Sequence, residues 1–180
     1  MNRVKALITD VLSARKKYLL LASTFSEEQS KWRPSPDVWN VTEITEHLFW
    51  AEQGGILGMW KTINAIRDGR MERRYNSVHK DMQIEEIIVL TWKEKEEVPA
   101  VAAPRLSGPL SFWLASLVSL QHVLEDFGND LQENELRLQA HPHPISGEMD
   151  FQQRLEFLRF HLNRHEEQAA RLISQMKQTV

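Results

Sequence analysis

Apolar residues recur at intervals of three and four along most of this 180-residue chain, and that spacing places them on one face of an α-helix. The pattern predicts four long helices, over residues 4–22, 41–69, 110–131 and about 150–176. No stretch shows the strict alternation that is typical of a β-strand. We therefore expect an all-α protein, a four-helix bundle in a single domain that spans residues 1–180.

Local signals predict where three of these helices begin. Asn40 with Glu43 three residues later is the pattern of a capping box at the start of the second helix. Asp150 with Gln153 is the same pattern before the last helix. For the third helix, the sequence offers a serine N-cap, either Ser107 or Ser111.

The segment 70–109 keeps the helical pattern only weakly, so we expect a long connection between the second and third helices. Apolar residues between Ile84 and Trp92 predict one short helix inside it. A charged run at 93–97 and a proline-bearing linker at 98–104 follow, and neither predicts regular structure.

The composition excludes several classes of function. The 22 Lys and Arg against 25 Asp and Glu give a net charge of −3, so nucleic acid is not an expected partner. The chain has no cysteine, which excludes disulfides and thiolate nucleophiles, and any reacting thiol must come from another molecule. The longest apolar stretch, 112–120, is too short for a bilayer and the first residues lack a signal-peptide pattern. We expect a cytoplasmic protein with no membrane partner.

Three histidines lie on the predicted inward faces of two helices. His161 and His165 are four residues apart, so both project from one face of the last helix, and His47 lies on the inward face of the second. Buried ring nitrogens need partners, and a divalent metal with three protein ligands would join them and keep a position open. Spacing alone also allows ordinary core histidines or a ring turned to solvent, so both interpretations stay open.

Polar residues near these histidines are candidates for catalysis. Glu52 follows His47 by five residues and Gln168 follows His165 by three, so each either lines a cavity around a metal or is a surface residue. We select Glu52 for proton transfer and keep Gln168 as a second candidate. Glu43 is better explained by its capping role.

The remaining histidines and aromatic residues favour structural interpretations. His141 and His143 stand beside prolines in a predicted turn, and Trp39 and Trp50 are typical of a core or an interface. Known metalloenzyme motifs also fail: no glutamate stands three residues before any of the three histidines, which excludes the di-iron carboxylate bundles. The last histidine pair has zincin spacing, but Leu162 stands where the general-base glutamate belongs.

Two segments together resemble the DinB-like (YfiT-like) metalloenzyme family. One is residues 32–52, with Trp-Arg-Pro followed by Trp-Asn-Val-Thr-Glu-Ile-Thr-Glu-His-Leu. The other is residues 136–172, with His-Pro-Ile-Ser-Gly followed by His-Leu-Asn-Arg-His-Glu-Glu-Gln. The resemblance implies a bundle of up-down-down-up order, and a divalent metal such as nickel or zinc held by His47, His161 and His165.

Proteins similar to this family include bacillithiol transferases and mycothiol-dependent isomerases, and many form homodimers. The resemblance therefore implies a metal-dependent transferase that adds a low-molecular-weight thiol to an electrophilic small-molecule substrate. A metal-dependent hydrolase and a non-catalytic, stress-associated metal-binding dimer are the alternatives. The chain departs from the family in the long connection at 70–109, which we expect to reshape the pocket.

Overall fold

The computed structural model describes residues 2–75, 78–93 and 97–179, and the regular elements of these residues are all helices. The α-helices are α1 (Arg3–Ala22), α2 (Val41–Arg67), α3 (Ile84–Thr91), α4 (Leu110–Asp130) and α5 (Phe151–Thr179), and the short 3-10 helices are η1 (Gln29–Lys31) and η2 (Glu133–Glu135). Among the described residues, extended pairing is limited to isolated bridges. The all-α class is confirmed.

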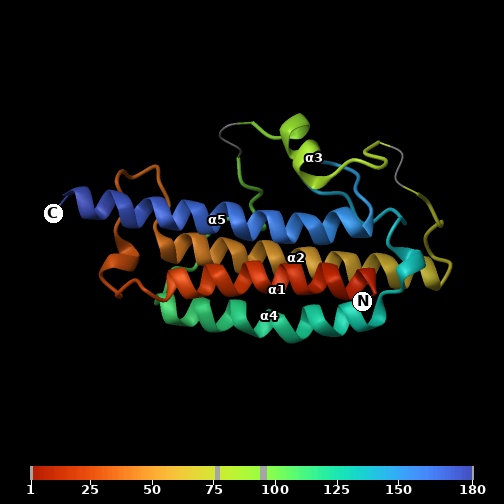
Figure 1. The fold of residues 1–180 in the computed structure, drawn as a ribbon, viewed down its shortest axis with the longest axis horizontal. Coiled ribbons are helices and arrows are strands. Elements are labelled where there is room, and N and C mark those ends of the chain that lie inside the picture. Colours follow the sequence, from red (N-terminus) through yellow and green to blue (C-terminus); the bar gives the residue numbers. More distant parts are fainter. Residues whose placement is uncertain (1, 76–77, 94–96, 180) are drawn as a thin grey trace.

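The four long helices lie side by side (Figure 1). Helix α1 packs against α5 and α4, and α2 packs against α4 and α5. Helices α2 and α4 run in one direction along the long axis, and α1 and α5 run in the other (Figure 1). Their buried faces form one core, which includes Val11, Ile44, Leu117, Phe127 and Leu155. No helix in the described part of the chain is long and apolar enough to span a membrane.

Capping boxes start two of the helices as the sequence predicts. The Asn40 side chain accepts a hydrogen bond from the Glu43 amide at 2.9 Å, and the Glu43 carboxylate accepts one from the Asn40 amide at 3.0 Å. Asp150 and Gln153 exchange the same pair of bonds at 2.8 and 3.1 Å. Each box supplies acceptors for amides that no helical carbonyl can reach.

The predicted serine cap of α4 is wrong. Pro109 occupies the N-cap position, and no side chain caps this helix. Ser107 lies instead in a left-handed turn with φ of 60°, where its carbonyl accepts a hydrogen bond from the Trp113 indole at 2.8 Å. Proline suits this helix start because it has no amide to satisfy and its φ is already restricted.

The connection between α2 and α4 contains the expected short helix, α3, which packs on the outside of α5. Part of the charged run, residues 94–96, lies outside the described residues.

Further along, the connection is held against α2 by the buried carboxylate of Glu46. That carboxylate accepts hydrogen bonds from the amides of Arg105 and Leu106 at 2.8 Å and of Ser107 at 3.2 Å. Burial alone would raise the pKa of Glu46, but these donors outweigh it and hold the pKa below its ordinary value.

Gly128 allows α4 to approach α1 closely. A methyl group at Gly128 would lie 2.5 Å from Cγ1 of Ile8, which is buried in the core. A contact this short forces the β-branched side chain or the helix to move.

We expect Gly128→Ala to lower the free energy of unfolding by about 1 to 3 kcal/mol, because Ile8 cannot move without disturbing its neighbours. Gly54→Ala is the matched control, since no heavy atom lies within 4 Å of the added methyl group. Its better helix propensity should stabilise the protein by up to about 1 kcal/mol. Urea denaturation measures both, and equal effects of the two substitutions would contradict the close approach.

Candidate metal centre

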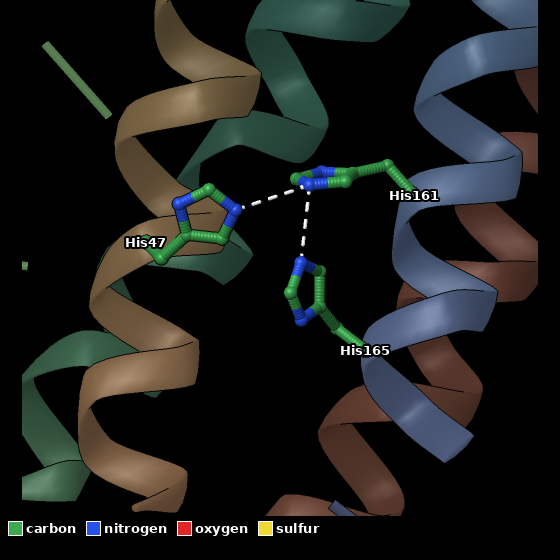
Figure 2. Close-up of side chains that lie close together, drawn as sticks. All are labelled: His47, His161 and His165. Atoms are coloured by element: carbon green, nitrogen blue, oxygen red, sulfur yellow. Dashed lines mark hydrogen bonds between the residues drawn. The ribbon is translucent and has the colours of Figure 1, made fainter. Parts of the chain in front are cut away.

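The three histidines converge between α2 and α5, His47 from α2 and the other two from α5 (Figure 2). Nε2 of His161 lies 3.0 Å from Nε2 of His47 and 3.1 Å from Nε2 of His165. Candidate ligand atoms of the three rings all lie within 4.8 Å of one another. His47 is 4% exposed, and His161 and His165 are each 7% exposed, so the cluster is buried.

Acceptors outside the cluster place the ring proton of two histidines on Nδ1. His47 Nδ1 donates to the Ala102 carbonyl at 2.8 Å, and His165 Nδ1 donates to Oε1 of Gln168 at 2.8 Å. Both rings therefore present an Nε2 lone pair to His161. His161 has one Nε2 proton at most, so within the trio at least one lone pair lacks a donor. This donor set fits a divalent cation.

Burial keeps these imidazoles neutral. It lowers the pKa of His47, and the hydrogen bond to Ala102 opposes that effect only in part. Burial is also the main cause that lowers the pKa of His165 to about 3. The pKa of His161 lies well below its ordinary value through burial, and the neighbouring rings lower it further. Neutral imidazole is the form that binds a metal.

The cluster lies in the wall of a cavity of about 1260 Å³. Helices α2 and α5, the connection at 97–105 and the loop at 141–145 surround this cavity. Trp39, with its ring centre 5.0 Å from that of His47, and Trp50 both line it, a position that the sequence interpretation did not assign to them. His141 and His143 line it too, and the ring of His143 packs on Phe157 at 4.3 Å.

The structure does not bring Glu52 to this centre. Its carboxylate pairs with the guanidinium of Arg15 in α1, and the two side chains are only 3% and 2% exposed. Glu52 does not occur among the described residues that line the cavity. A step of five residues turns a helical side chain by about 140° from the first, so Glu52 and His47 face different neighbours. The structure thus places Glu52 elsewhere than the proton-transfer prediction requires.

Gln168 does lie at the centre and lines the cavity. Its described contact there is with Nδ1 of His165, so it orients a ring. Sequence reasoning missed two further residues. Ala102 acts through its backbone carbonyl, which no side-chain motif reveals. Arg154 lines the cavity seven residues before His161, and that spacing on the face of α5 is the signal that marks it.

These features define an all-helical protein with a buried three-histidine cluster that is able to bind a metal ion. The chain belongs to the DinB superfamily, whose sequence profile matches residues 11–169. A crystal structure described as the conserved protein of locus from Enterococcus faecalis has a similar fold, with a TM-score of 0.54 and 11% identity over 96% of this chain and 95% of that chain. No curated protein matches the sequence.

We expect Glu52→Ala to lower the free energy of unfolding by about 3 to 5 kcal/mol, because Arg15 is then buried without its carboxylate. Chemical denaturation measures the loss. The double variant Arg15→Leu/Glu52→Leu should recover much of the stability, since neither charge is buried in it. Unchanged stability of Glu52→Ala would show that the pair does not support the fold.

In the metal-free protein, the free energy of unfolding should fall as the pH drops below about 6.5, the ordinary pKa of histidine. The unfolded chain binds protons there, whereas His165 stays neutral until about pH 3 in the folded protein, so the loss continues down to that pH. Urea denaturation in chelator at about pH 7.5, 6 and 5 measures the slope. His122→Gln is the control, because the His122 side chain is 86% exposed and its removal should keep the slope. A free energy of unfolding that does not change between these pH values would contradict the burial of the three histidine rings in their neutral form.

Proposed function

We propose that this protein is a metal-dependent enzyme, an up-down-down-up four-helix bundle that transfers a low-molecular-weight thiol to an electrophilic small molecule. The convergence of three oriented, neutral imidazoles at the wall of a large cavity carries the proposal. Membership of the DinB superfamily supports it.

His47, His161 and His165 would hold the divalent ion, with nickel or zinc as the expected metals. When bound, such an ion supplies Lewis acidity that favours the deprotonated form of a thiol or of water near neutral pH. A set of three protein ligands also leaves room for an external ligand, which separates a catalytic site from a closed structural one.

The chain's own residues prepare this site for a small molecule. The Ala102 carbonyl and the Gln168 side chain hold two rings with Nε2 turned inward. Trp39, Trp50 and Trp92 add apolar surface to the cavity wall, which excludes water and packs against a bound substrate. Because the sequence contains no cysteine, the thiol must be a separate molecule.

Removal of one imidazole should remove the metal. We expect His161→Ala to lose bound metal, because its Nε2 contacts both other rings, and His47→Ala and His165→Ala to bind it far more weakly. Gln168→Ala should lower metal affinity by about 10- to 100-fold, since it frees the His165 ring. Elemental analysis and metal titration measure these changes, with His122→Ala as the control. An equal content of bound metal in the parent protein and in His47→Ala would show that His47 is not a ligand.

The reaction is tested with the metal-loaded protein, an activated aryl halide as the electrophile and cysteine as the thiol probe. Transferase activity requires added thiol and is lost in His161→Ala. Turnover without thiol would instead indicate the hydrolase. Stoichiometric metal with no turnover of a panel of electrophiles would indicate the non-catalytic alternative. The homodimer and the cytoplasmic location stay predictions from the sequence.

A further inference from the structure

Arg154 carries a buried positive charge that no carboxylate of the described residues balances. It is 4% exposed and lines the same cavity as the three histidines. Its Nη2 donates to Nε2 of His141 at 2.9 Å, while its Nε and Nη1 are buried without a hydrogen-bond partner. Arg15 is buried to the same degree, but it is paired with Glu52.

A charge in this position is costly, because a buried ion needs a counter-ion and full hydrogen bonding. Burial lowers the pKa of Arg154 to about 10, which leaves it protonated at neutral pH. Burial and the charge of Arg154 lower the pKa of His141 to about 4, so His141 is a neutral acceptor and supplies no negative charge. None of the described carboxylates forms an ion pair with Arg154, although Asp37 and Glu97 line the same cavity, and this leaves the guanidinium able to pair with a small anion.

The surroundings hold this guanidinium in place. A methyl group at Gly58 would come within 2.4 Å of Cε1 of His141, so only glycine leaves room for that ring against α2. At Gly55 an added methyl group would lie 3.7 Å from Nη2 of Arg154, an ordinary van der Waals contact, so Arg154 also packs against α2 there. The carbon of the guanidinium lies 5.8 Å from the centre of the Phe157 ring. Arg154 is therefore fixed by His141 and by close packing.

Arg154 and the histidine cluster share one face of α5. Arg154 precedes His161 by seven residues, which is two helical turns or roughly 10 Å along the axis. Phe157 lies between them and stacks on His161, with ring centres 5.4 Å apart. A molecule that spans this distance would have an anionic end at Arg154 and an apolar body over Phe157.

We propose that Arg154 binds the carboxylate of a small organic acid, whose other end reaches the three histidines. A guanidinium presents a planar fork of donors that matches a carboxylate. One guanidinium also balances one negative charge, which favours a carboxylate over a doubly charged phosphate. As a statement about the substrate this rests on the proposed function, whereas the anion site itself rests on Arg154 and its neighbours.

Benzoate is the probe for this site, and benzamide is its neutral counterpart of equal shape. Each is titrated into the full-length, chelator-treated protein, with binding followed by calorimetry and tryptophan fluorescence. We expect benzoate to bind at least ten times more tightly than benzamide or inorganic phosphate. Arg154→Met should abolish that preference. Arg159→Met should keep it, because Arg159 lies on the same helix but pairs with Glu85. Equal binding of benzoate and benzamide would overturn the proposal, and tighter binding of phosphate would overturn the carboxylate assignment.

Thermal unfolding separates a binding role from a structural one. Arg154→Met should unfold at a higher temperature than the parent without ligand, because a buried unpaired charge is replaced by an apolar side chain. Benzoate should raise the midpoint of the parent and leave that of the variant unchanged. A variant that is less stable than the parent and still prefers benzoate would overturn the proposal. Should Arg154→Met fail to fold, Arg154→Lys decides: weaker benzoate binding supports the site, and unchanged binding overturns it.

The metal plays no part in this measurement, so the two proposals fail separately. A parent protein that binds benzoate at Arg154 but no metal would overturn the proposed function and leave the anion site standing. A protein that binds metal through the three histidines but does not discriminate benzoate from benzamide would overturn the anion site and leave the proposed function standing.

Discussion

Three imidazole nitrogens that meet between two packed helices cannot all satisfy one another with hydrogen bonds. His47 and His165 each use their Nδ1 proton outside the cluster, so two lone pairs face His161, which has one proton at most to donate there. Burial also holds the rings neutral. The fold thus maintains, in the wall of the cavity, a buried set of acceptors that is able to bind a metal ion.

The long connection between α2 and α4 takes part in this arrangement through two neighbouring residues of α2. Glu46 anchors the amides of residues 105–107, and His47 donates to the carbonyl of Ala102 a few residues earlier. The guanidinium of Arg105 also lies over the ring of Trp50, 4.3 Å from its centre. The same contacts therefore close one side of the cavity and orient a ring of the cluster, which links the stability of the connection to the geometry of the site.

The two buried arginines show how one residue type takes different roles. Arg15 meets Glu52 between α1 and α2, where the two charges offset each other away from the cavity that contains the histidines. Arg154 has the neutral ring of His141 as its partner and lines the cavity, and two of its nitrogens are buried without a hydrogen-bond partner. The first arrangement supports packing. The second leaves a buried positive charge without a counter-ion in the same cavity as the histidines. Such a charge is costly in a purely structural position, whereas a binding site can use it.

The sequence by itself determined the helices, two capping boxes and the inward position of the three histidines, because periodicity and capping depend on residues a few positions apart. It did not determine which neighbour each face meets. Glu52 forms an ion pair with Arg15, and Ser107 lies in a turn and does not cap α4. The carbonyl of Ala102 accepts a hydrogen bond from His47, which is 55 residues away in the sequence. Only the tertiary structure decided those partners and the isolation of Arg154, because burial and pairing arise from elements that are distant in sequence.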